Sequence, residues 1–172
     1  PAPPPQATLT FKSKRSLEQV HFCLGVPCYE LPHEMRYPTY VLNTILGGSF
    51  TSRLNYNLRE THGYSYGAGS SFAMRPQPGP FVASSSVQTD VTDKALTEFI
   101  RELSGILGDI SDEELTRAKN YEALGYPANF QTTGQIAGAL MELVTYGLPD
   151  TYFNDYVKNI LAVTKEQVQA AA

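Results

Sequence analysis

The sequence is poor in the residues that hold metal ions or form disulfide bonds. Its 172 residues include two cysteines and three histidines. Cys23 and Cys28 lie five residues apart across Pro27, and an extended chain would hold them beyond the Cα separation of a disulfide. We therefore expect two free thiols. A chain of this length can bury a hydrophobic core without disulfide or metal support.

Long apolar runs and an excess of basic charge are also absent. No apolar stretch approaches the roughly 20 residues that span a bilayer, so no membrane segment is predicted in these residues. The formal net charge is -4, and lysines and arginines are scattered among acids. Because nucleic-acid binding requires a basic stripe or patch, nucleic acid is not an expected partner.

Proline is concentrated at the start, where residues 1–5 read PAPPP. Such a segment predicts a stiff, extended linker of polyproline character and suggests that something precedes it in the native chain. We predict a proline-rich linker and a leading strand over residues 1–16, and a single domain over residues 17–172.

Hydrophobic periodicity predicts three strands in the first half of the domain. Residues 18–27 alternate between apolar positions and small or polar ones, which is typical of a strand with one buried face. Residues 64–74 and 81–88 predict two more strands, and the proline-rich segment 75–80 suits the turn of a hairpin. Two helices are predicted between the first strand and the hairpin, over residues 38–46 and from Phe50, where Phe50, Leu54 and Leu58 repeat every four residues.

The second half predicts helices. Apolar stripes run through Ala95, Leu96, Phe99, Ile100, Leu103 and Leu107 and through Ile136, Leu140, Leu143 and Val144. Ser111–Glu114 and Thr164–Gln167 are capping boxes, and Asp150 is predicted to cap a helix that carries Phe153, Tyr156, Val157 and Ile160. This order of elements predicts an α+β fold, a two-layer sandwich in which helices cover one face of a mostly antiparallel sheet.

One local motif points to a serine hydrolase. Residues 63–67 read GYSYG and match the G-x-S-x-G nucleophile elbow, which requires a strand before the serine and a helix after it. Here a helix precedes and a strand follows, so Ser65 is interpreted as structural and the serine hydrolase remains the unfavoured alternative. Gly47-Gly48-Ser49 could hold an anion at a helix start, but it lacks a phosphate-loop lysine and favours a tight turn between helices.

The histidines do not predict a metal site. His21, His33 and His62 are isolated, and His33-Glu34 has no second histidine beside it, so the H-x-x-E-H motif of zinc peptidases is absent. We expect no zinc in this chain. A different pair draws attention: Arg59 lies seven residues before Tyr66, at a predicted helix end and a following strand. If they converge, both can donate hydrogen bonds to a carbonyl oxygen, whereas most such residues only cap helices or cover a rim.

Linked motifs in the same order carry a family resemblance. Residues 41–54 read VLNTILGGSFTSRL, followed by LRE at 58–60 and GYSY at 63–66. The chain closely resembles the C-terminal, non-zinc half of insulinase/pitrilysin-type zinc peptidases, in particular the bacterial processing-protease-like branch. The resemblance runs from the Gln19 strand to the helical tail. It implies a domain that closes with a homologous zinc-bearing half around an unfolded peptide.

The resemblance also implies roles for particular residues. Arg59 and Tyr66 would contact the substrate backbone near the scissile bond, with Tyr64 as the neighbouring candidate if the register differs, and Ser84 and Ser86 would line the chamber. Zinc is expected in the partner half, whether that half lies upstream in the same chain or in a separate subunit. A periplasmic or otherwise exported location in a bacterium is expected. The alternative within the family is an assembly scaffold without peptidase activity.

One departure from the family concerns the end of the chain. The family's domain usually closes with an apolar strand, whereas this sequence stops at Ala170-Ala171-Ala172. The final strand is therefore expected to be missing from these residues.

Overall fold

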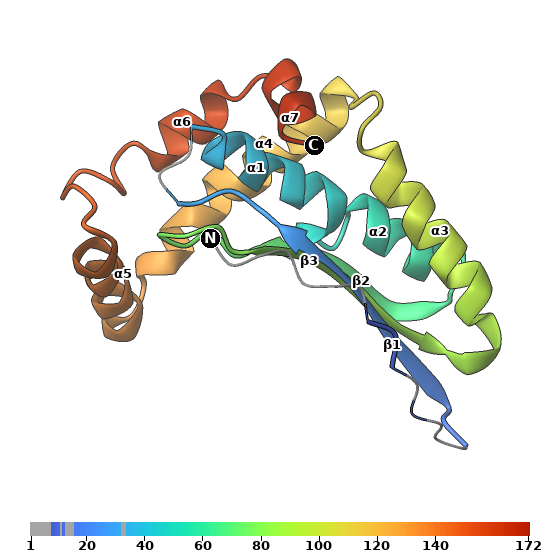
Figure 1. Ribbon diagram of the computed structural model, residues 1–172. Coiled ribbons are helices and arrows are strands. Elements are labelled where there is room, and N and C mark those ends of the chain that lie inside the picture. The colour runs from blue at the N-terminus through green and yellow to red at the C-terminus, as the bar shows by residue number, and fades with distance from the viewer. Residues whose placement is uncertain (1–7, 11, 13–15, 32–33) are drawn as a thin grey trace.

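Two layers make up the computed structural model, which describes residues 8–10, 12, 16–31 and 34–172 (Figure 1). One layer is an antiparallel sheet with strand order β1-β3-β2, and the helices lie on one of its faces. The predicted α+β two-layer fold is confirmed. The linker residues 1–7 and His33 lie outside the described residues.

The three strands fall where alternation predicted them. They are β1 (Gln19–Pro27), β2 (Ser65–Phe72) and β3 (Pro80–Gln88). Phe22 of β1 contacts Phe99 of the helical layer, with ring centres 4.9 Å apart. His21, one residue earlier, bonds the exposed Ser86 hydroxyl across the strands at 2.9 Å. Neighbouring residues on β1 therefore point to opposite faces of the sheet: one face packs on the helices, and the other is open.

The first two helices pack directly on the sheet. α1 (Arg36–Asn43) continues through the π-helical turn η1 (Thr44–Gly48), and α2 (Arg53–Asn55) continues as η2 (Tyr56–Thr61). Gly47 lies so close to β2 that an added Cβ would clash with the Ser70 amide nitrogen and sit 2.8 Å from the Gly69 carbonyl carbon. Gly47 thus does more than separate two helices, because it lets the first one approach the strand.

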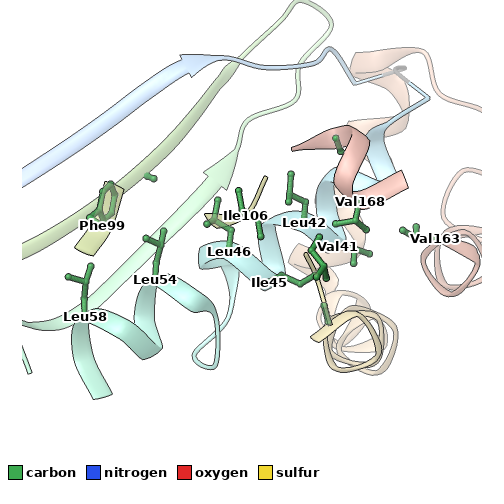
Figure 2. Packing of buried hydrophobic residues seen from close by; sticks show 14 of the residues in the cluster. Val41, Leu42, Ile45, Leu46, Leu54, Leu58, Phe99, Ile106, Val163 and Val168 are labelled. Carbon is green, nitrogen blue, oxygen red and sulfur yellow. The ribbon is translucent and has the colours of Figure 1, made fainter. Parts of the chain in front are cut away.

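Figure 2 shows the core between these layers. Leu54 and Leu58 of the second predicted helix are fully buried, beside Phe99 and Val87. Phe50 was predicted to extend this stripe, and that prediction is wrong: its side chain is 59% exposed. The helix begins only at Arg53, so Phe50 lies in the turn before it, off the stripe.

The remaining helices follow the hairpin. They are η3 (Thr89–Val91), α3 (Thr92–Gly105), α4 (Asp112–Gly125), η4 (Tyr126–Phe130), α5 (Thr133–Tyr146), α6 (Tyr156–Ala162) and α7 (Lys165–Ala171). Both predicted capping boxes are confirmed, at Ser111 and Thr164. A third, formed by Thr132 and Gln135, opens α5.

Two predictions about this half are wrong. Asp150 does not cap a helix, because residues 149–154 form successive turns with the Tyr152 and Asn154 amides bonded three residues back, and α6 begins at Tyr156. In α3 the buried line runs through Ala95 and Phe99, while Leu96 and Ile100 are exposed, as is Leu107 in the turn after the helix.

The apolar stripe of α5 is also exposed. Ile136, Leu140 and Val144 all lie on the surface, with Val144 85% exposed, and no residue of α5 is buried. Figure 1 shows α5 at the end of the molecule opposite α3. An apolar helix face of this kind normally packs on another element, but the described residues do not cover it.

Both cysteines are free thiols, with Cys23 exposed and Cys28 half-buried. Burial raises the pKa of the Cys28 thiol. None of the helices in the described part of the chain is long and apolar enough to cross a membrane.

Candidate functional site

A surface pocket of about 430 Å³ lies where η2 meets the sheet. It gathers Arg59, Tyr64 and Tyr66 together with Ser86 of β3. The other lining residues come from the start of β1, from η2 and the turn after it, from the start of β2 and from the end of β3: Gln19, Glu60, Gly63, Ser65, Val87 and Gln88. Of the residues that the family resemblance singled out, only Ser84 is not part of this lining.

A glycine turn brings the two halves of the motif together. Gly63 has a φ of 65° and ends η2, and its amide donates to the Arg59 carbonyl at 3.1 Å. Only glycine adopts this left-handed backbone without strain. The chain therefore reverses from helix to strand within a few residues, which places Tyr66 on β2 beside the helix end that carries Arg59.

The Arg59 guanidinium is held from two sides. Its central carbon lies 4.6 Å from the ring centre of Phe50, a cation-π contact, and its Nε lies 3.2 Å from a Glu60 carboxylate oxygen. The buried Asn55 fixes the Phe50 turn, since its amide donates to the Phe50 carbonyl at 2.6 Å. The Asn55 oxygen accepts from the Ala68 amide of β2 at 3.3 Å. Asn55 thereby ties the turn below Arg59 to the strand that carries Tyr66.

The two tyrosines differ in how they are used. Tyr66 is 89% exposed, and its hydroxyl has no hydrogen-bond partner among the described residues. Tyr64 is half-buried against the core and stacks on His62, with ring centres 5.0 Å apart and 12° between the planes. Both phenols line the pocket, but Tyr66 is the more exposed of the two, whereas Tyr64 also packs against the core.

The Ser65 hydroxyl is engaged in hydrogen bonds with neighbouring residues of the sheet. Its Oγ lies within hydrogen-bond distance of the Gly67 and Ser86 carbonyls, at 2.6 and 2.8 Å, and accepts from the Gly67 amide and the Ser85 hydroxyl. This serine holds the irregular start of β2, where the pairing with β3 shifts between Ser65 and Ala68. A helix precedes it and a strand follows, so the nucleophile-elbow geometry does not form.

Two candidate chamber residues lie on the open face of β3. Ser86 is exposed and Ser84 half-buried, while the intervening Ser85 is buried under the helices. Ser84 is paired with Cys23 and Ser86 with His21. This face therefore offers small or polar side chains.

His21 and His62, the two histidines among the described residues, have different partners. His21 bonds Ser86, and His62 Nε2 lies 3.7 Å from Glu98, a carboxylate that also pairs with Arg101. Within residues 8–10, 12, 16–31 and 34–172, no three His, Cys, Asp or Glu side chains gather in a way that could hold a metal ion. The described side chains therefore do not form a zinc site. The absence of zinc from the whole chain remains a prediction.

Sequence reasoning missed an ion pair that braces this part of the fold. Arg53 of α2 binds Glu114 of α4 through two contacts, Nε–Oε1 at 2.6 Å and Nη2–Oε2 at 2.9 Å. The hydrogen bond from Arg53 lowers the pKa of Glu114 to about 2, against the cost of its burial. Phe50 and Asn55 were missed as well. Arg53 and Glu114 are 61 residues apart, so no local spacing identifies their pair. The roles of Phe50 and Asn55 depend on how the turn at Phe50 folds against Arg59 and β2.

Comparisons with known proteins agree with this geometry. Residues 1–122 match the family described as "Peptidase M16 inactive domain". The uncharacterized zinc protease YmxG of Bacillus subtilis is 47% identical over 53 residues, which cover 31% of this chain and 13% of that protein.

Solved structures share the fold. The peptidase M16 inactive domain from Pseudomonas fluorescens superposes with a TM-score of 0.82 at 26% identity, covering 90% of this chain and 37% of that one. The periplasmic protease PqqL from Escherichia coli superposes with a TM-score of 0.68 at 20% identity, covering 89% and 17%. The chain thus spans well under half the length of each of these proteins. It belongs to the peptidase M16 inactive-domain family, which confirms the resemblance to the non-zinc half of insulinase/pitrilysin-type peptidases.

Proposed function

We propose that this chain is the non-catalytic, substrate-binding half of a zinc-dependent metalloendopeptidase. It closes over a peptide and supplies Arg59 and Tyr66 to the substrate backbone. The observation that carries the proposal is the single pocket that collects both side chains beside the open face of the sheet. Membership of a family whose relatives include proteins named zinc proteases supports it.

Both side chains can donate hydrogen bonds to a carbonyl oxygen of a bound peptide. Such donors matter most where negative charge develops on that oxygen during hydrolysis. Arg59 is exposed and its contact with Glu60 is a surface ion pair, which is worth about 0–1 kcal/mol. Exchanging this partner for a substrate carbonyl therefore costs little, and Tyr66 has no internal partner to lose among the described residues.

The sheet supplies the remaining recognition. β2 and β1 each have one neighbour, β3, among the described strands, so each presents an edge to which an extended peptide can add. Main-chain bonds to an edge give affinity with little sequence demand. The small side chains of Ser84 and Ser86 on the open face suit a chamber that accepts varied peptides.

Zinc belongs to the partner half in this proposal. A bound zinc polarises a scissile carbonyl and activates water, which the described residues of this chain cannot do. The partner half lies upstream in the same chain or in a separate subunit. An exported, periplasmic location in a bacterium is proposed with it, supported by the structural neighbour that is a periplasmic protease.

Reconstitution tests the proposal. The purified chain is expected to hydrolyse no peptide, and adding the zinc-bearing half is expected to produce chelator-sensitive peptidase activity. Turnover by the purified chain in the presence of a chelator would contradict the proposal. A stable assembly with an intact zinc motif but no peptidase activity would favour the alternative of an assembly scaffold.

A further inference from the structure

A second cavity, of about 350 Å³, opens between α5 and aromatic residues of α1, η4, the turns before α6 and the first residue of α6. Six aromatic rings line it, those of Tyr40, Tyr126, Phe130, Tyr152, Phe153 and Tyr156. It shares no lining residue with the pocket that holds Arg59 and Tyr66. Its volume lies within the range of about 300–1,000 Å³ usual for small-ligand sites.

Most polar groups around this cavity already have partners. The Tyr126 hydroxyl donates to the Phe153 carbonyl at 3.1 Å, and the Tyr156 hydroxyl donates to Glu122 at 2.8 Å. Gln135 is used by the capping box of α5, and its amide donates to the Ala128 carbonyl at 3.0 Å. The walls therefore offer ring surface more than free hydrogen-bonding groups.

Glu142 is the one charged side chain in the lining. It projects from α5, is half-buried, and forms no ion pair within 4 Å in the described part of the chain. Burial raises the pKa of its carboxyl group, against a smaller opposing effect of Arg36. A nearby positive charge would stabilise this half-buried carboxylate, since removing an unpaired charge from water is costly.

Arg36 does not fill this role. Its guanidinium lies 4.4 Å from the Tyr37 ring centre and 4.7 Å from that of Tyr152, and it donates to the Tyr37 hydroxyl at 2.6 Å. It is not among the lining residues of the cavity. Its stacking on Tyr152 does show that this aromatic cluster accommodates an organic cation.

We propose that the aromatic cavity binds the alkylammonium group of a lysine side chain, with Glu142 as its counter-ion. Aromatic rings attract a cation over their faces, and cages of aromatic rings recognise ammonium ligands such as choline and methyl-lysine. At this cavity Glu142 adds a negative charge to the aromatic walls. The bound lysine would belong to a peptide or partner protein. The site works whether or not the chain serves a peptidase, because no residue of the Arg59 pocket takes part.

Binding to the full chain tests this directly. The probe is N-acetyl-lysine methylamide, titrated while the ring resonances of Tyr126 and Tyr152 are followed by NMR, and the matched control is the norleucine analogue, which has no charge. Saturable shifts with the lysine probe and weaker binding of the norleucine probe are expected. Glu142→Gln should weaken lysine binding roughly fivefold or more, since it removes the counter-ion.

Two further variants keep the result interpretable. Glu113→Gln removes a carboxylate from the exposed face of α4 and should leave binding unchanged, whereas Phe130→Leu removes one wall ring but keeps an apolar side chain and should weaken it. Equal binding of the two probes to the unmodified chain would overturn the proposal, as would shifts confined to other residues. Wild-type affinity in Glu142→Gln would overturn it too.

Discussion

The guanidinium of Arg59 lies 4.6 Å from the ring centre of Phe50, which stands nine residues earlier in the chain. Phe50 is 59% exposed, so it contributes little to the core. Its ring serves as a support for the cation, while Glu60 holds the Nε from the other side at 3.2 Å. An arginine positioned in this way needs less ordering when a substrate binds.

Replacing Phe50 by leucine is expected to free the Arg59 side chain. The cation-π contact is worth about 0.5–1 kcal/mol at an exposed site, so the guanidinium should become more mobile while the fold is kept. ¹⁵N relaxation of the Arg59 Nε measures this in the chain alone. Phe50→Tyr retains the ring and should behave like the natural chain. Unchanged Arg59 mobility in Phe50→Leu would show that Glu60 alone holds it.

The Arg53–Glu114 pair predicts a pH-dependent stability. The pKa of Glu114 is lowered in the folded chain from 4.5 to about 2, so its contribution is complete above about pH 4.5 and is lost as the pH falls towards 2. Glu114→Gln keeps a residue able to complete the capping box, and should cost roughly 1–3 kcal/mol at pH 7.

Thermal unfolding at several pH values checks this. The difference between Glu114→Gln and the natural chain should shrink between about pH 4.5 and 2. Glu113→Gln, which alters an exposed residue 3.8 Å from Arg117, should change stability by about 0.5 kcal/mol or less. A constant difference across this pH range would mean that the charge of Glu114 is not the cause.

Gly47→Ala should destabilise the fold by about 1–3 kcal/mol, because the added methyl group would meet the backbone of β2 and push η1 away from it. Gly105→Ala is the matched control, since a Cβ at that helical position meets nothing within 4 Å. It should be neutral or stabilise by up to about 1 kcal/mol. Denaturant unfolding measures both, and equal effects of the two changes would refute the close approach at Gly47.

The purified chain is expected to hold no stoichiometric zinc after mild chelation. Its histidines are isolated in sequence, and tight zinc sites need three or four converging ligands. Elemental analysis measures the content. One tightly held zinc per chain, lost on replacing His21 or His33, would be incompatible with the proposed division of labour between the halves.

Much of the fold could be predicted because it rests on local periodicity. Alternation placed all three strands, and the capping boxes at Ser111 and Thr164 marked helix starts that depend only on residues three apart. Predictions failed where burial depends on distant packing. The stripes of α3 and α5 are apolar over a wider arc than the described core covers, so Leu96 and Val144 are exposed.

The candidate site, too, could be predicted only where it depends on local sequence. The turn at Gly63 that joins Arg59 to Tyr66 is local, and the order of helix and strand around Ser65 could be inferred from pattern. The support of Arg59 by Phe50 and the bridge from Asn55 to Ala68 could not, because they depend on how the turn at Phe50 folds against η2 and on how α2 packs on β2. Spacing alone also left Tyr64 and Tyr66 equivalent, and their different burial separates them.

The central claim is that Arg59 and Tyr66 act on the substrate backbone in the assembled enzyme, and peptide turnover by Tyr66→Phe tests it most directly. Removing one donor at a well-formed oxyanion site typically costs about 10²–10³ in turnover. The loss should be smaller here, since much of the charge would fall on the partner half's zinc. Folding, zinc content and association of the halves should be unchanged, because only a hydroxyl is deleted.

Tyr64→Phe, made in the same assembled enzyme, is the control for register. The account predicts that turnover falls in Tyr66→Phe and stays near the natural value in Tyr64→Phe, since the Tyr64 ring is stacked on His62 and packs against the core. A loss of turnover in Tyr64→Phe alone would assign the substrate contact to Tyr64, one strand pleat away. Natural turnover in both variants would contradict the claim and leave the pair with a structural role only.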